Sequence, residues 1–160
     1  MKKATKKPGT RAPDAITLLK QDHAAVSKLF EQYDKLGDRA LAKKEKLART
    51  ICNELKVHTR IEEEIFYPAV ESVLPKEQDL LDEAQVEHDG AKTLIAQLDA
   101  MKPGDDLFDA KVTVLSEYIK HHVKEEHEDM FPKVRKTKLD LHEVGMRLAF
   151  RKAELKKELR

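Results

Sequence analysis

The chain has 160 residues, of which 40 % are hydrophobic and 38 % are charged, with five glycines and no tryptophan. This length is typical of one domain that can bury a core, and the composition favours a helical protein with charged outer faces. A single cysteine, Cys52, excludes an internal disulfide and any cysteine-based zinc or iron–sulfur site, and we interpret it as a small helix residue in a reducing compartment. No segment has the roughly 20 apolar residues of a membrane span, and the N-terminus does not resemble a secretory signal, so we expect a cytoplasmic protein.

The net charge of +1 hides an uneven distribution. Residues 1–13 carry five basic groups and no acid, and residues 133–160 carry ten basic and four acidic groups, so residues 14–132 carry a net charge of −10. Such basic ends either bind nucleic acid, a membrane or an acidic partner, or are simply solvated. Neither end interleaves aromatic residues as single-strand binders do, so we favour a disordered tail over residues 1–13 and a solvated C-terminal helix.

Four segments repeat apolar residues three and four positions apart, which predicts amphipathic helices. Asp14, after Pro13, is a suitable N-cap for the first. Turn residues separate the segments at Gly37-Asp38, Pro75 and Pro103-Gly104-Asp105. The four stripes are Ile16, Leu19, His23, Val26, Phe30 and Tyr33; Leu47, Ile51, Leu55, Ile61 and Ile65; Leu81, Ala84, His88, Ala91, Ile95 and Leu98; and Val112, Leu115, Ile119, His122, Glu126 and Met130.

A fifth amphipathic stretch begins at about Leu139 and carries Leu141, Val144, Leu148, Leu155 and Leu159. We therefore predict an all-α fold, with an up-down-up-down four-helix bundle over residues 14–134 and a C-terminal helical extension over residues 135–160. The extension either lies across the bundle or forms a dimer contact.

The two halves of the predicted bundle resemble each other. QDHAAVSKLF at 21–30 matches VEHDGAKTLI at 86–95 with an offset of 65, and HTRIEEEIFYP at 58–68 matches HVKEEHEDMFP at 122–132 with an offset of 64. These offsets indicate a duplicated helical hairpin, residues 14–75 and 76–134. The matched pairs are His23 with His88, His58 with His122, Glu62 with Glu126, Tyr67 with Phe131, and Pro68 with Pro132.

His121 and His122 each precede a glutamate by four residues, but both the repeat and the apolar stripe select His122 as the inward residue. We interpret His121, His127 and His142 as solvated or boundary histidines. Glu63 and Glu125 are most simply solvated, although either could orient an inward imidazole.

Each predicted helix thus contributes one inward histidine, and two helices add a glutamate. A lone histidine on an apolar stripe is usually a hydrogen-bonded core residue, but four of them with two carboxylates favour a pair of metal ions. Burying two unpaired carboxylates costs roughly several kcal/mol each, which a bound cation offsets. The HxxxE spacing puts both side chains on one helix face, so the glutamate can bridge two ions. The predicted metal ligands are His23, His58, Glu62, His88, His122 and Glu126.

Mixed nitrogen and oxygen ligation suits iron or manganese, with zinc as a further candidate. Four protein ligands per ion leave positions for an oxo or hydroxo bridge and for an exogenous ligand, so the predicted centre is reactive.

The pattern H…HxxxE…H…HxxxE, with FYP and FP after the HxxxE elements, resembles the hemerythrin-like, or HHE cation-binding, domain over about residues 14–134. The resemblance implies a four-helix bundle with two non-haem irons that binds dioxygen or a related small molecule. It also implies two histidines for each iron and two bridging glutamates: His23 and His58, His88 and His122, and Glu62 with Glu126.

The chain departs from this family pattern at one position. Oxygen-carrying hemerythrins add a fifth histidine one turn after the third-helix ligand, where this chain has Lys92, with Ser27 as its repeat counterpart. One iron should therefore lack a ligand, which argues against simple oxygen storage. Glu54 and Tyr118, one turn before the two HxxxE histidines, are either extra ligands, hydrogen-bond partners of ligands, or helix-boundary residues.

The expected function is binding and reaction of dioxygen, hydrogen peroxide or NO at a carboxylate-bridged di-iron site, with peroxide decomposition or iron-redox protection favoured. The first alternative is a reversible oxygen or NO carrier or sensor without turnover. A metal-free helical interaction protein that uses its basic ends is the second. We expect a small molecule as the main partner, with a homodimer as a further expectation and nucleic acid less favoured.

Overall fold

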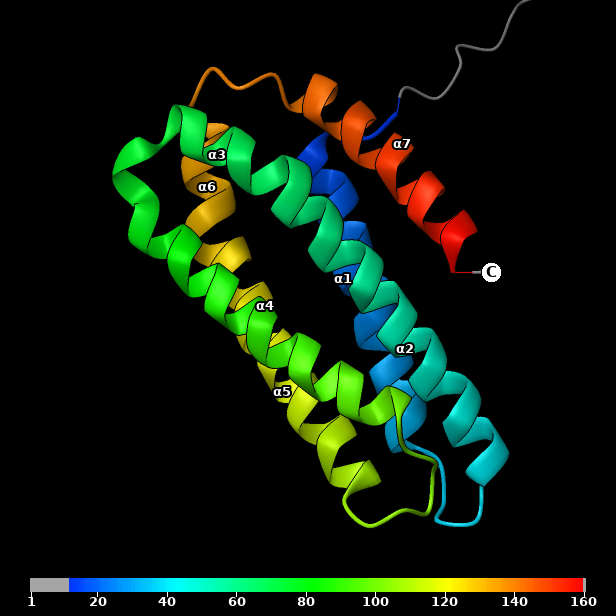
Figure 1. Ribbon diagram of the computed structural model, residues 1–160. Coiled ribbons are helices and arrows are strands. Elements are labelled where there is room, and N and C mark those ends of the chain that lie inside the picture. Colours follow the sequence, from blue (N-terminus) through cyan, green and yellow to red (C-terminus); the bar gives the residue numbers. More distant parts are fainter. Residues whose placement is uncertain (1–11, 160) are drawn as a thin grey trace, which may run out of the picture.

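The structure is a computed structural model that describes residues 12–159. It confirms the all-α prediction: four antiparallel helical rods form a bundle, and a fifth helix lies alongside (Figure 1). Most of the tail predicted over residues 1–13 lies outside the described residues. In chain order the elements are α1 Ala15–Asp34, α2 Leu41–Ile61, a π-helical turn Glu62–Phe66, α3 Tyr67–Val73, a 3-10 turn Pro75–Glu77, α4 Gln78–Asp99, α5 Phe108–Glu125, a second π-helical turn Glu126–Met130, α6 Phe131–Arg135 and α7 Leu141–Glu158.

Helix α1 begins where the sequence predicts. The side chain of Asp14 accepts a hydrogen bond from the backbone N–H of Thr17 at 2.8 Å, which satisfies one of the free donors of the first turn. Asp140 caps α7 in the same way, accepting from the N–H of Glu143 at 3.0 Å. The loops after α1 and after α4 lie at the same end of the bundle, as Figure 1 shows.

Two of the four rods contain a widened turn at matching positions. The backbone N–H of Tyr67 bonds to the carbonyl of Glu62, and that of Phe131 bonds to the carbonyl of Glu126. Pro68 and Pro132 are the second residues after these turns, and proline has no N–H to continue the regular helical ladder. π-helical turns of this kind are often found at functional sites, and here each begins at a glutamate of an HxxxE element.

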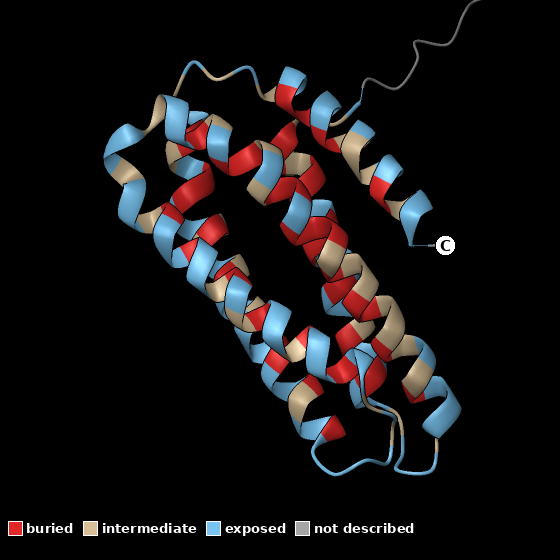
Figure 2. Cartoon of the chain, viewed as in Figure 1, coloured by how far each residue is buried: buried red, intermediate tan, exposed pale blue. Residues whose placement is uncertain are grey.

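Two apolar clusters fill the bundle, one toward each end, and buried residues line the inner faces of the rods (Figure 2). The first cluster includes Leu19 and Ile61, and the second includes Val26 and Leu55. His23 follows Leu19 and precedes Val26 along α1, so it lies between the two clusters. A layer of buried polar residues, which includes His23, His58, His88 and His122, therefore separates two apolar regions of the core. We call it the polar layer. Cys52 belongs to the second cluster and is a free, buried cysteine.

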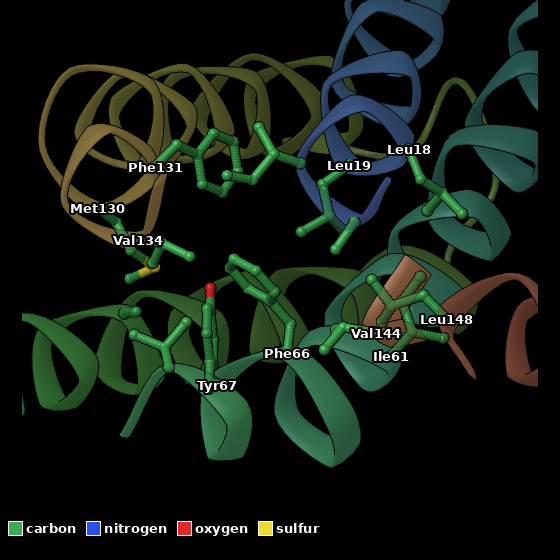
Figure 3. Packing of buried hydrophobic residues seen from close by; sticks show 14 of the residues in the cluster. Leu18, Leu19, Ile61, Phe66, Tyr67, Met130, Phe131, Val134, Val144 and Leu148 are labelled. Atoms are coloured by element: carbon green, nitrogen blue, oxygen red, sulfur yellow. The ribbon is translucent and has the colours of Figure 1, made fainter. Parts of the chain in front are cut away.

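Helix α7 packs on the bundle. Its residues Val144, Leu148 and Leu155 are buried within the first cluster, and Figure 3 shows Val144 and Leu148 close to Ile61. Gly145 allows this close approach, because a Cβ there would lie 2.6 Å from the carbonyl oxygen of Pro13. The C-terminal extension thus lies across the bundle. Within residues 12–159, no helix has the length and apolarity needed to cross a membrane.

Candidate metal centre

Four buried histidines, one from each rod, meet in the polar layer between the two apolar clusters. The Nε2 atoms of His23 and His58 are 3.1 Å apart, and those of His88 and His122 are also 3.1 Å apart. A neutral imidazole has one donor and one acceptor nitrogen, so two facing Nε2 atoms require a shared proton or a cation between them. The layer therefore contains two imidazole pairs, each suited to a cation.

Glu62 contacts both pairs of histidines. Its Oε1 contacts Nε2 of His58, and its Oε2 lies 3.5 Å from Nε2 of His88 and 3.7 Å from Nε2 of His122. The second glutamate lies across the same space, with Oε1 of Glu126 3.4 Å from Nε2 of His23 and 3.0 Å from Nε2 of His122. Two carboxylates therefore lie between the imidazole pairs, as bridging ligands would.

The strongest sign of a cation-binding site is the surroundings of the carboxylate oxygens. Among the described residues, Oε1 of Glu62 and Oε1 of Glu126 are buried and make no hydrogen bond of good geometry, although imidazole nitrogens lie beside both. Buried acceptors of this kind are rare in folded proteins and are costly when they are charged. Two sets of ligand atoms lie within 4.8 Å of one another, so the residues fit a pair of metal ions: His23, His58, Glu62 and Glu126 in one set, and Glu62, His88 and His122 in the other.

The ionisation of the layer follows from its burial and its charges. Burial opposes the charge on Glu62, but the charge of His58 and hydrogen bonds from the histidines outweigh it and hold the pKa of this carboxyl well below its usual value. Burial also opposes the charge on His58, yet Glu62 and Asp22 raise its pKa to about 10. Without metal, protons on the imidazoles thus balance the buried carboxylates, and a metal ion would take the place of these protons.

Tyr67 is a member of the cluster that the sequence analysis did not select. Its hydroxyl donates to Oε2 of Glu62 and lies 3.3 Å from Oε2 of Glu126, 3.2 Å from Nε2 of His88 and 3.1 Å from Nε2 of His122. Figure 3 shows this hydroxyl pointing into the bundle. Burial and the two carboxylates raise the pKa of Tyr67 well above its usual value. The sequence repeat could have indicated this role. The position that matches Tyr67 in the second half is Phe131, so only the first half has a hydroxyl there.

Each of the four imidazoles also has a neighbour at Nδ1, on the side away from the cluster. Such outer partners fix the orientation of a ligating imidazole and the nitrogen that carries its proton. The pairs are His58 with Oδ2 of Asp22 at 3.1 Å, His23 with Nε2 of His127 at 2.8 Å, and His122 with Oε1 of Glu87 at 3.5 Å, whereas Oε2 of Glu63 lies 3.7 Å from Nδ1 of His88, too far for a hydrogen bond.

Two predictions about histidines have different outcomes. The structure buries His122 and leaves 66 % of the His121 side chain exposed. The interpretation of His127 as a boundary histidine is incomplete, since its ring contacts His23. His127 follows Glu126 in the π-helical turn, where the helical period changes, and a regular 3.6-residue pattern does not predict this contact.

The structure does not bring Glu54 or Tyr118 to the cluster. Glu54 forms an ion pair with Lys156 of α7 at 3.3 Å, and Tyr118 is 48 % exposed. Lys92, which stands where the oxygen carriers have a fifth histidine, is also exposed and pairs with Glu63 at 2.6 Å. None of the three supplies an additional ligand in this arrangement.

A cleft of about 180 Å³ between α1 and α5 leads from the surface to His23. Apolar side chains and two serines line its walls, and Lys120 and Lys124 lie along its α5 side. A small molecule could therefore approach the polar layer from this side of the bundle.

The sequence and fold match known proteins. Residues 14–134 match the profile of the Hemerythrin HHE cation binding domain. A protein of Nostoc sp. named DNA nickase is 28 % identical over 120 residues, which are 74 % of this chain and 32 % of that protein, so the chain spans about a third of that curated relative. The crystal structure of an HHE cation binding domain-containing protein, the Rv2633c homolog from Mycobacterium kansasii, superposes with a TM-score of 0.77 at 22 % identity, covering 91 % of this chain and 89 % of the other. Since the profile covers the whole bundle that carries the His/Glu cluster, this chain belongs to the Hemerythrin HHE cation-binding domain family.

Proposed function

We propose that the chain is a non-haem di-iron protein that binds and reacts with dioxygen, hydrogen peroxide or NO, and that its main activity is peroxide decomposition or protection against reactive iron. The observation that carries this proposal is the pair of buried carboxylates of Glu62 and Glu126, whose Oε1 atoms lie beside imidazole nitrogens without making a hydrogen bond of good geometry. Iron fits this mixed nitrogen and oxygen donor set, and manganese is the next candidate.

Four histidines and two glutamates would hold the pair of ions. His23 and His58 would bind one ion and His88 and His122 the other, with Glu62 and Glu126 between them. When bound, the irons would supply Lewis acidity and redox equivalents to a small oxidant. The protein's own contribution is a dry, preorganised pocket, because apolar clusters lie on both sides of the layer.

Tyr67 is the residue best placed to handle a proton at the centre. Its hydroxyl is within hydrogen-bond distance of both glutamates and of two histidines, and its raised pKa keeps it protonated at neutral pH. It can therefore donate a hydrogen bond to an oxygen atom that enters between the two imidazole pairs. The cleft beside His23 gives such a molecule a route inward.

A reversible carrier or sensor is the alternative function. The lysine at position 92 weighs against it, because the side chain that would complete the coordination of an oxygen carrier is replaced by an exposed cation paired with Glu63. An ion with fewer protein ligands leaves more room for reaction than for simple storage.

Nucleic acid is a less favoured partner. Within the described residues 133–159, six basic side chains form ion pairs with acidic groups of the protein. Three of them, Lys152, Arg151 and Lys156, pair with Asp22, Glu64 and Glu54 of the bundle. This pairing leaves little free positive charge on α7 for phosphates. The name of the Nostoc relative makes a plasmid-nicking assay on the iron-loaded protein a direct check of this candidate.

An oxygen electrode tests the main proposal. Iron-loaded protein is mixed with hydrogen peroxide, and catalytic release of dioxygen is expected for the wild type and for a His142→Ala control, whose exposed ring lies on α7. The rate should fall at least about tenfold in Tyr67→Phe if the hydroxyl assists the reaction. A stable optical change without dioxygen release would instead support the carrier or sensor.

A further inference from the structure

A chain of contacts leads from α7 to the polar layer. Nζ of Lys152 contacts Oδ1 of Asp22, and Oδ2 of Asp22 lies 3.1 Å from Nδ1 of His58. Asp22 precedes His23 in α1 and lies within the region that matches the family, whereas Lys152 lies beyond residue 134, where that match ends. An element outside the family domain thus reaches one of the four inward histidines through a single carboxylate.

The burial of this carboxylate explains why it needs a cation. The side chain of Asp22 is 9 % exposed, and that of Lys152 is 25 % exposed. The two oxygens of Asp22 each have one partner, with Nζ of Lys152 at Oδ1 and Nδ1 of His58 at Oδ2. Without Lys152, a charged Asp22 would rely on the imidazole alone for compensation.

The contact with Asp22 determines which nitrogen of His58 faces the cluster. Oδ2 of Asp22 accepts a hydrogen bond from Nδ1–H of His58, so Nε2 of the same ring faces Glu62 and His23. The other carboxylates beside Nδ1 atoms of the four imidazoles are Glu63, 3.7 Å from His88, and Glu87, 3.5 Å from His122. Among the described residues, the contact between Asp22 and His58 is the shortest carboxylate contact at an Nδ1 atom, and it is the one that α7 supports.

The position of Lys152 is fixed by the packing of its helix. Val144, Leu148 and Leu155 bury one face of α7, and Gly145 lets the helix touch the start of α1. The residue before Lys152 adds a second anchor, since the guanidinium of Arg151 donates two hydrogen bonds to Glu64, at 2.7 Å and 3.3 Å. Lys152 therefore reaches Asp22 from a helix that is packed against the bundle.

We infer that α7 is a working part of the metal centre: Lys152 and Asp22 are positioning residues that orient His58, so retention of the metal depends on the C-terminal helix. This inference rests on the proposed metal-binding function. It predicts that loss of the Lys152 charge weakens the orientation of the His58 ring without disturbing the fold. Loss of an outer partner of a metal-bound histidine typically lowers metal affinity about 10-fold to 100-fold.

The test compares Lys152→Met and Lys152→Arg with Arg151→Met, all in the full chain. Arg151→Met is the matched control, because it removes the neighbouring positive charge and its ion pair with Glu64, a carboxylate that pairs with Arg60 rather than with a histidine. Release of iron to an excess of chelator is expected to be about 10-fold faster in Lys152→Met, and close to the wild-type rate in Lys152→Arg and Arg151→Met. Equal release from Lys152→Met and the wild type would overturn the inference, as would equal acceleration in both methionine variants.

A second readout uses the metal-free protein and does not depend on the proposed function. Nitrogen-15 spectra of the imidazoles should show a slowly exchanging proton on Nδ1 of His58 in the wild type and in Arg151→Met, and its loss or rapid exchange in Lys152→Met. Persistence of that proton in Lys152→Met would contradict the positioning role. A wild type that binds no metal yet shows this pattern would refute the proposed function and the role of α7 in metal retention, and would leave α7 as the support of a structural histidine.

Discussion

Oε2 of Glu62 lies 3.5 Å from Nε2 of His88, although the two residues come from opposite hairpins of the bundle. The other oxygen of the same carboxylate contacts His58 in its own hairpin. One side chain therefore links the two imidazole pairs, and the centre exists only when the two hairpins are packed together. This arrangement leads to specific predictions about metal binding and stability.

The bridging glutamates should be essential for metal retention. In Glu126→Gln, a neutral amide replaces a buried carboxylate that faces His23 and His122, so we expect metal affinity to fall at least about tenfold. Glu128→Gln is the matched control, because Glu128 lies two residues away in the same turn but is exposed. Equilibrium metal titration of both variants gives the comparison, and equal affinities would show that Glu126 is not a ligand.

Tyr67 should stabilise the metal-free protein through its hydroxyl. Tyr67→Phe leaves Oε2 of Glu62 without its donor, and an unsatisfied buried group of this kind costs about 1–3 kcal/mol of unfolding free energy. Tyr118→Phe removes an exposed hydroxyl, so its effect should stay within about 0.5 kcal/mol. Urea unfolding of both metal-free variants measures the difference. If Tyr67→Phe proved as stable as Tyr118→Phe, the hydroxyl would have no structural role in the layer.

Gly145 should be required for the packing of α7. A Cβ at this position would lie 2.6 Å from the Pro13 carbonyl oxygen and 2.8 Å from the Ala15 nitrogen, and backbone atoms there cannot easily move away. We expect Gly145→Ala to lower the unfolding free energy by about 1–3 kcal/mol and to increase hydrogen exchange in α7. Gly37→Ala is a suitable control, since its Cβ would have no neighbour within 4 Å. Unchanged exchange in α7 would show that the close approach is not needed.

The effect of pH on stability should reverse when metal is bound. The pKa of His58 rises from its ordinary 6.5 to about 10 in the metal-free fold, so its protonation stabilises that fold fully below 6.5 and this stabilisation is lost as the pH rises toward 10. The loaded protein should behave oppositely, because metal must displace these protons and competes better as their concentration falls. Melting temperatures across this range, with and without metal, should therefore move in opposite directions. Parallel trends would contradict the exchange of protons for metal.

Much of the fold could be predicted from the sequence because its signals are periodic. Apolar spacing marked all five helices, and the Asp14 cap fixed the start of the first. The repeat and the stripe together selected six inward residues, which the structure brings into one layer. Each of these signals depends on the regular 3.6-residue helix, which holds for most of this chain.

The sequence could not predict the features that depend on local deviations or on tertiary packing. His127 reaches His23 from within a π-helical turn, which changes the helical period. Asp22 and Lys152 are 130 residues apart and meet only because α7 packs beside α1. Glu54 and Tyr118 fit a one-turn spacing rule, yet their helices turn them toward α7 and toward solvent. Helical spacing thus identified the inward residues, but not the residues that contact the outer nitrogens of their imidazoles.

The most direct test of the central claim is the metal content of purified protein, measured for the wild type, His122→Ala and His142→Ala. His122 is buried among the proposed ligands, whereas His142 is exposed on α7. We predict about two irons per chain in the wild type and in His142→Ala, and a clear loss in His122→Ala. Little or no metal in the wild type, or equal metal in all three proteins, would contradict the assignment of this layer as a di-iron centre.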